Sequence, residues 1–211
     1  MTPKQNYYEN VAATIIKNLA KRQMEGYYCP DSAAAVKKVL ELIPAGASVA
    51  WGGSMTLTET GLMDALKGAP YQIIDRDAPA TPEERRKMNG AICCADYFLM
   101  STNAITLDGQ LINIDGRGNR VSFLCFGPEN VVVLAGMNKL AEDVESGLAR
   151  VRTAAAPPNA VRLNKNTPCA VTGVCADCQS PDCICAQTVI TRRSLVPNRI
   201  KVILIGEELG Y

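Results

Sequence analysis

The chain has 211 residues, of which 47% are hydrophobic and 20% charged, and its formal net charge is +1. This composition is that of an ordinary globular protein, and it argues against nucleic acid or anionic membrane as a partner because there is no basic excess. No apolar run approaches the roughly 20 residues of a membrane span, and the polar N-terminal segment lacks the apolar stretch of a secretory signal. We therefore expect a cytoplasmic protein.

Helix and strand patterns alternate along the first half of the chain. Apolar residues recur at helical spacing between Tyr8 and Leu19 and again between Val36 and Ile43, where Asp31 or Ser32 begins the second helix. Short apolar runs that predict strands lie at 48–51, 71–74 and 97–100. Such alternation predicts an α/β fold with a parallel sheet flanked by helices.

The second half of the chain departs from this alternation. Two β-prone runs between Ile105 and Ile114 flank Asp108-Gly109, the pair that most favours a type I′ hairpin turn. Further elements are expected as a buried strand at 131–134, a long helix with its apolar stripe from Leu140 to Val151, and a last buried strand at 202–205. The prolines and asparagine at 156–159 then begin an irregular lobe. It contains the cysteine-rich segment and is inserted before the last strand.

A glycine-rich turn, Trp51 to Thr56, lies between a predicted strand and a predicted helix. Its exposed amides and the positive end of the helix would favour phosphate, carboxylate or a nucleotide-like ligand. The same turn also suits a plain helix cap, with Ser54 or Thr56 as the capping oxygen. Glu59 has two interpretations as well, either a catalytic base or nucleophile, or the carboxylate of a Thr56–Glu59 capping box. A second such box is predicted at Thr81–Glu84.

Polar residues follow another predicted strand and then fill a glycine-rich turn. The candidates for anion recognition there are Asn103, Asp115, Gly116, Arg117, Gly118, Asn119 and Arg120. Ligands in open α/β sheets gather at the carboxyl ends of strands, and arginine can pair with an anion through two hydrogen bonds. The alternative is two ordinary turns, with Arg117 and Arg120 in solvent.

Five of the nine cysteines fall between Cys169 and Cys185, in a chain without histidine. Thiolate-rich sites favour zinc or an iron–sulfur cluster, and disulfides fit poorly with a cytoplasmic chain. We therefore predict a metal site in this segment, with the spacing matching neither a zinc nor a cluster pattern cleanly. The other four cysteines, Cys29, Cys93, Cys94 and Cys125, are interpreted as core residues.

The motifs in series resemble a known family. They are GGSMTLTETGL (52–62), STNAITLDGQLINIDGRGNRV (101–121), FGPENVVVLAGMNKLAEDVESGLARVR (126–152), AAPPNA (155–160), TPCAVTGVCADCQSPDCIC (167–185) and the terminal GEELGY. This series is similar to the lactate-utilization protein family, the LUD domain, and to its protein C-like members in particular. The resemblance covers nearly the whole chain. It implies a single LUD domain over 1–211, with the cysteine lobe at 167–186, and a Rossmann-like fold of the NagB/RpiA/CoA-transferase superfamily with helices on both faces of the sheet.

The resemblance also implies particular site residues. Proteins of that superfamily bind phosphorylated sugars or acyl-CoA at the corresponding turns, which points to Gly52, Gly53, Ser54, Thr56, Asn103 and 116–119. Similar family members carry arginine where this chain has Cys183. The implied metal ligands are therefore Cys169, Cys175, Cys178 and Cys185, with Cys183 as an alternative.

The family resemblance implies a role in the oxidation of L-lactate to pyruvate beside iron–sulfur partner subunits, and it leaves the chemical step open. In one hypothesis the chain is a redox accessory subunit with an iron–sulfur or zinc lobe and a crevice for a small anionic metabolite. In another it is an enzyme resembling a CoA transferase or sugar isomerase that uses Glu59. A third is a zinc-stapled binding or regulatory protein. A homo-oligomer is compatible with each.

Overall fold

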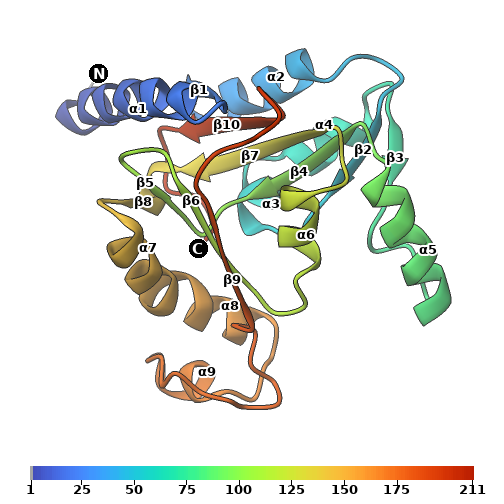
Figure 1. Ribbon diagram of the computed structural model, residues 1–211, viewed down its shortest axis with the longest axis vertical. Coiled ribbons are helices and arrows are strands. Elements are labelled where there is room, and N and C mark those ends of the chain that lie inside the picture. The colour runs from blue at the N-terminus through green and yellow to red at the C-terminus, as the bar shows by residue number, and fades with distance from the viewer. Residues whose placement is uncertain (1) are drawn as a thin grey trace.

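The computed structural model describes residues 2–211 and has a parallel β-sheet at its centre (Figure 1). Neighbouring strands of this six-stranded sheet are all parallel and follow the order β1, β10, β7, β4, β2, β3. Their bounds are β1 Glu25–Cys29, β10 Ile200–Ile205, β7 Asn130–Gly136, β4 Tyr97–Ser101, β2 Ser48–Trp51 and β3 Gln72–Ile74. The predicted α/β fold with a mostly parallel sheet is confirmed.

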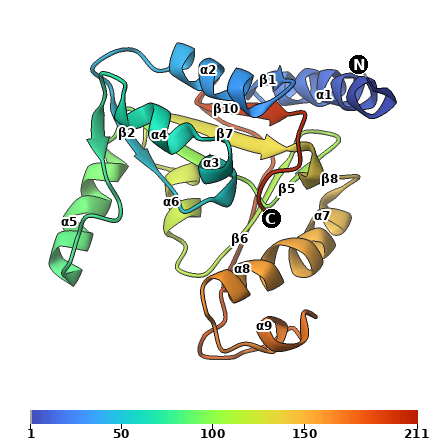
Figure 2. The ribbon, with the colours of Figure 1, turned by 180° about the vertical axis from the view of Figure 1, so that it is seen from behind.

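Helices cover both faces of the sheet because its central strands are apolar on both sides. Val131 and Val133 of β7 pack into one core, and Val132 and Leu134 into the other. The first face carries α1 (Pro3–Lys21), α5 (Pro82–Cys93) and α6 (Asn119–Cys125). The opposite face carries α2 (Ser32–Leu42), α3 (Met55–Glu59) and α4 (Leu62–Lys67), the last two in front of the sheet in Figure 2. None of the described helices is both long and apolar enough to cross a membrane.

A second, four-stranded sheet lies between the first sheet and the C-terminal helices (Figure 1). Its strands, in order, are β8 (Leu140–Ala141), β5 (Ala104–Thr106), β6 (Leu111–Asp115) and β9 (Gln187–Thr191). The helical elements beyond it are α7 (Val144–Arg150), a π-helical turn (Val151–Ala155), α8 (Ala156–Arg162) and α9 (Pro168–Thr172). Strand β9 was not predicted, and it pairs antiparallel with β6 directly after the cysteine segment.

Two expectations for the second half were wrong. Leu140 lies in β8, and the helix begins at Val144 because Asp143 caps it through the Ser146 amide. Pro157 and Pro158 do not interrupt the helical run. They occupy the first turn of α8, where a backbone N–H is dispensable, immediately after the π-helical turn.

The hairpin between β5 and β6 forms as predicted, but its turn is not type I′. A type I′ turn requires a positive φ at both Asp108 and Gly109, and only Gly109 has one, at +87°. The Gly109 amide bonds to the Thr106 carbonyl at 2.9 Å, and the Thr106 amide bonds to the Gln110 carbonyl at 3.0 Å. The connection is therefore a three-residue loop with a left-handed glycine.

Candidate functional site

A cavity of about 370 Å³ opens where the carboxyl ends of β2, β4 and β6 meet the start of α3, the end of α8 and the cysteine segment. Several residues proposed from the sequence line it, namely Gly53, Ser54, Thr56, Asn103, Asp115, Gly116, Arg117, Asn119 and Arg120. Gly52, Gly118 and Glu59 are not among its lining residues. The two polar turns, about 50 residues apart in sequence, thus meet at one place, as the rule for parallel sheets predicts.

Gly52 and Gly53 make room for arginine side chains. A Cβ at Gly52 would lie 3.2 Å from Cγ of Arg120, and one at Gly53 would lie 3.0 Å from Nη1 of Arg76. Neither glycine has a positive φ, so the reason for glycine here is close approach, which is stricter at Gly52, beside the anchored Arg120, than at Gly53, beside the flexible end of Arg76. The Gly52 amide donates to the Leu99 carbonyl at 2.9 Å, whereas Gly53 lines the cavity and its amide stays a candidate donor to an anion.

Arg120 organises the inner side of the cavity. Its Nε lies 3.3 Å from the Asp115 carboxylate. Its Nη groups donate to the Ser101 carbonyl, the Asn113 side chain, the Asn103 side chain and the Ile114 carbonyl. Burial lowers the pKa of Arg120 and the Asp115 charge opposes that shift. Since all its terminal donors are engaged, Arg120 orders the wall and has no terminal N–H left for a ligand.

The same network fixes the orientation of Asn103, a residue expected to bind the ligand. Its Oδ1 accepts from the Ile114 amide at 3.0 Å and from Arg120 at 3.1 Å. With the oxygen held by two donors, the amide nitrogen lies on the opposite side of the group. Asn103 lines the cavity, so this nitrogen is available to donate to a ligand.

Lys139, which was not predicted, is the most deeply buried cation of the site. It ends the 3-10 turn Met137–Lys139 after β7, and its side chain is only 2% exposed. Its Nζ donates to Thr56 Oγ1 at 2.7 Å and to Ser101 Oγ at 2.8 Å. Burial, together with Arg150 and Arg120, lowers the pKa of Lys139 to about 7, and Glu59 opposes this. Its place just beyond a predicted buried strand was the signal that could have identified it.

Positive charge dominates the cavity. Its cationic residues are Arg76, Arg117, Arg120, Lys139, Arg162 and Lys165, and its single acidic side chain, Asp115, is paired with Arg120. Arg117 has no hydrogen bond or ion pair with residues 2–211, and Lys165 has a distant one, 3.6 Å from Asp182. An anion entering the cavity would meet several cations whose donors are not fully used.

The N-terminal cap of α3 agrees with one expectation for this turn, a capping Ser54, and differs from another, the Thr56–Glu59 capping box. Ser54 is the N-cap, accepting from the Leu57 amide at 3.4 Å, so the expected Thr56–Glu59 capping box is wrong. Thr56 instead donates to the Leu209 carbonyl at 3.2 Å and accepts from Lys139. Glu59 is exposed and accepts from the Gly210 amide at 2.6 Å. The box at Thr81–Glu84 is confirmed.

The cysteine segment forms part of the cavity wall. Ile184, which stands between Cys183 and Cys185, lines the cavity. A Cβ on Gly116 would come within 3.4 Å of the Ile184 Cα, and the Ala186 amide donates to the Asp115 carbonyl at 3.1 Å. The glycine-rich turn at 115–120 and the cysteine segment, which were predicted as two separate sites, therefore lie next to each other at the cavity.

The thiols of this segment interact without forming a ligand set. Cys185 is an exposed residue, but the surrounding chain partly desolvates its thiol. This desolvation, followed by the charges of Cys183, Cys175 and Cys169, raises the pKa of the thiol to about 12. Residues 2–211 contain no group of three or more cysteine or acidic side chains arranged to hold a metal ion. The thiols would have to converge to bind one, so the metal site stays a prediction.

The interpretation of the other cysteines as core residues holds for Cys29 and in part for Cys93, which packs against the core. Cys93 is partly buried, whereas Cys94 and Cys125 are exposed. The reason is their place at helix ends, since Cys94 is the C-cap of α5 and Cys125 is the last residue of α6. Helix ends reach the protein surface more often than helix centres do.

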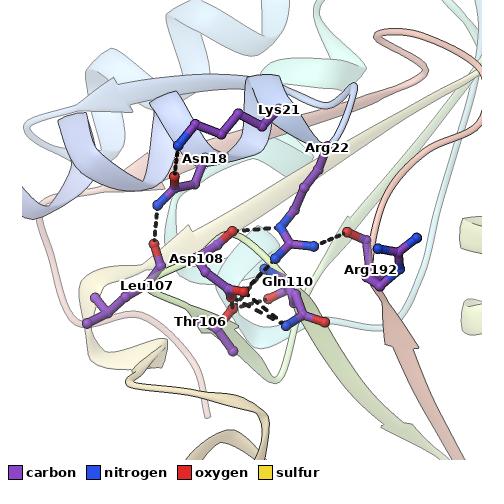
Figure 3. A network of polar contacts seen from close by, with 8 residues as sticks. All are labelled: Asn18, Lys21, Arg22, Thr106, Leu107, Asp108, Gln110 and Arg192. Carbon is purple, nitrogen blue, oxygen red and sulfur yellow. Dashed lines mark hydrogen bonds and ion pairs between the residues drawn. The ribbon is translucent and has the colours of Figure 1, made fainter.

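A smaller polar cavity of about 260 Å³ lies at the C-terminal end of α1. Figure 3 shows the network of polar contacts beside it. Arg22 donates to the backbone carbonyls of Asp108 and Arg192, each at 2.6 Å, and pairs with the Asp108 carboxylate. Its guanidinium thereby ties α1 to the hairpin loop and to the residue after β9. This cluster stabilises the junction of the two sheets.

Comparison with known proteins places the chain in a family. The family model described as the LUD domain matches residues 12–205. A DUF162 family protein from Deinococcus radiodurans has 12% identity and a TM-score of 0.56, with 94% of this chain and 98% of that chain covered. Ribose 5-phosphate isomerase A from Methanocaldococcus jannaschii has 15% identity and a TM-score of 0.36, with 63% and 62% covered, too distant to bear on the fold. No curated protein matches significantly. The chain belongs to the LUD domain family.

Proposed function

We propose that the chain binds a small anionic metabolite in the cavity at the carboxyl edge of the parallel sheet, as its part in lactate utilization. Membership in the LUD domain family suggests a function associated with lactate utilization. The observation that carries the ligand class is Lys139, a buried amine without an ion-pair partner among residues 2–211, in a cavity whose one acidic side chain is already paired.

Electrostatics favours an anion as the occupant. A buried ammonium group is costly unless an opposite charge or good hydrogen bonds compensate it, and Lys139 has only two hydroxyl partners. Arg150 and Arg120 add to the positive potential at this point. A carboxylate or phosphate would supply the missing charge, and the cavity volume is in the range of small-molecule sites.

Isothermal titration calorimetry tests this proposal with L-lactate, pyruvate and inorganic phosphate as separate probes at low ionic strength. We expect at least one probe to bind, with an affinity that falls as salt is added. Arg117→Gln should weaken binding about 5- to 10-fold, because it removes a charged donor whose hydrogen bonds are otherwise unused.

Arg86→Gln is the matched control, since Arg86 is exposed on α5 and does not line the cavity. It removes the same charge from the protein. Equal weakening in both variants would indicate a nonspecific charge effect, and failure of all three probes to bind would contradict the proposal.

A second candidate function is that of a redox accessory subunit whose cysteine segment holds an iron–sulfur cluster or zinc. Its support is that Cys169, Cys175 and Cys183 lie close enough to Cys185 to shift its titration, and that Ile184 links them to the cavity. Thiolates would be the ligands, and a cluster would supply one-electron transfer beside the bound metabolite. Iron, sulfide and zinc analysis of protein purified without oxygen tests it. Colourless protein without iron or zinc would contradict it.

A further inference from the structure

The hydrogen bonds around Lys139 determine which side of its amine is open. Thr56 Oγ1 donates its proton to the Leu209 carbonyl at 3.2 Å. Ser101 Oγ has acceptors at 3.3 Å in the Thr102 carbonyl and in Thr56 Oγ1. Both hydroxyl oxygens therefore accept from Lys139, and neither directs a proton at its nitrogen.

The remaining tetrahedral position of the Lys139 nitrogen has no partner within residues 2–211. Two N–H groups are engaged by the hydroxyls, so this position carries a third proton when the group is charged and the lone pair when it is neutral. Since Lys139 lines the cavity, a ligand there is within reach of it. The environment that lowers the pKa to about 7 keeps a large neutral fraction at neutral pH.

A structural lysine would have different surroundings. Buried lysines that only support a fold usually pair with a carboxylate, and Lys139 has no carboxylate in ion-pair contact within the described chain. Lys139 also makes no hydrogen bond to a backbone carbonyl of the described chain, because its two hydrogen-bond partners are both hydroxyls. Hydroxyls can accept and return protons, which suits an amine that changes its bonding.

We propose that Lys139 binds an anionic aldehyde or ketone covalently, forming an imine between its Nζ and the carbonyl carbon. This deepens the proposed anion site and rests on it. The acid group of the ligand would be held by the outer cations Arg117, Arg162 and Lys165. The carbonyl carbon would then meet the amine at the buried end of the cavity.

The step balances with water as its only other product. The nitrogen lone pair forms the C–N bond while the carbonyl π bond opens, and the oxygen takes up a proton as the nitrogen gives one up. The resulting carbinolamine loses its oxygen as water with a second proton from the nitrogen, which leaves C=N. Thr56 and Ser101, each in direct contact with Nζ, can relay these protons. No oxidant or reductant takes part.

Reductive trapping followed by peptide mass spectrometry tests the proposal. The wild-type chain is incubated with sodium cyanoborohydride and either pyruvate, a carboxylate-bearing ketone, or glyceraldehyde 3-phosphate, a phosphate-bearing aldehyde. We expect a reduced adduct on Lys139 that forms at least about tenfold faster than on Lys67, whose side chain is 75% exposed. The two probes show which acid group the site accepts.

Two controls separate this proposal from the anion site on which it rests. Lys139→Arg retains a positive charge but cannot form an imine, so it should lose the adduct. L-Lactate has no carbonyl, and it should slow labelling of Lys139 in the wild type without slowing that of Lys67, which keeps the test valid even if the variant fails to fold. Equal labelling of Lys139 and Lys67, or anion binding without any adduct, would overturn the imine. Absence of both anion binding and protection would overturn the anion site itself.

Discussion

Two regions border the cavity and are built in opposite ways. The inner wall, made of Thr56, Ser101, Asp115, Arg120 and Lys139, is drawn from segments scattered over the chain, and its polar groups are buried and hydrogen-bonded to one another. The cysteine segment, 167–186, is continuous in sequence, mostly exposed, and its thiols are not arranged as a ligand set. Closeness in sequence therefore does not by itself assemble a site, whereas the edge of a sheet does.

The difference also predicts where rigidity lies. The buried polar groups of the inner wall hold one another in place, because each broken contact leaves a polar group unsatisfied. The cysteine segment is held by fewer contacts, such as the Asn166 amide to Asp182 at 2.9 Å and Ser180 to the Asn166 carbonyl at 3.1 Å. It is therefore the part of the cavity wall with fewer buried hydrogen bonds to hold it in place.

The largest expected effect concerns the cysteine segment. If it binds iron or zinc, Cys183→Ser should abolish the bound metal and Cys178→Ser should retain most of it. The reason is that the Cys183 sulfur lies directly beside Cys185, whose amide donates to it at 3.4 Å, whereas Cys178 has no such contact with another cysteine of the described chain. The family resemblance predicts the reverse, with Cys178 as a ligand. Metal content per chain after anaerobic purification decides between them, and the two variants control for each other because both exchange one thiol for a hydroxyl.

The inner wall should fail when its central cation is removed. Arg120→Met leaves the Asp115 carboxylate buried without its partner and frees several acceptors, and we expect a loss of about 3–5 kcal/mol in the free energy of unfolding. Urea denaturation measures it. Arg117→Met, three residues away in sequence but exposed, should change stability by less than about 0.5 kcal/mol. Similar losses in both would contradict the structural role assigned to Arg120.

Lys139 should make stability depend on pH above neutrality. Its folded pKa of about 7 lies below the ordinary value of 10.5, so between these values the unfolded chain binds more protons than the folded one. The free energy of unfolding therefore rises with pH in this window, whereas below pH 7 the full cost of burying the charge is present.

Comparison with Lys139→Met isolates this effect from other titrating groups. Relative to the variant, the wild type should gain about 2–3 kcal/mol between pH 7 and pH 9 in buffers without phosphate or carboxylate. Urea denaturation at each pH provides the measurement. Curves that stay parallel over this window would mean that the Lys139 amine titrates near its ordinary value.

The fold could be read from the sequence because its signals are local and repeated. Strand β7 contains a run of valines and a leucine, and α1 has apolar residues at helical spacing. Both patterns can be recognised without knowledge of the tertiary structure. The continuation of the helix through Pro157 and Pro158 was not predictable in this way, because it depends on a π-helical turn. Because this helix was not expected, Arg162 at its end was not identified as a cavity residue.

The candidate site was partly predictable, for a physical reason that also explains the omissions. Asn103 and the turn at 115–120 follow strand ends, and the convergence of strand ends in a parallel sheet brings them together. The different roles of the two arginines could not be predicted, since Arg120 is held inside by contacts with Ser101 and Asp115 that Arg117 does not make. Cysteine spacing likewise gives no information on whether thiols converge.

The smallest expected effect is that of Glu59→Gln, and it tests a residue just outside the inner wall. The glutamine retains an oxygen for the Gly210 amide and loses the charge, so stability should fall by no more than about 1 kcal/mol. The Glu59 charge raises the pKa of Lys139, so its removal should shift the pH-dependent rise in stability to lower pH. Thr58→Ala, at the exposed neighbouring position on α3, should leave that rise unshifted. If Glu59→Gln instead left the Lys139 titration in place but abolished a turnover that the wild type performs, Glu59 would be the catalytic carboxylate of an enzyme.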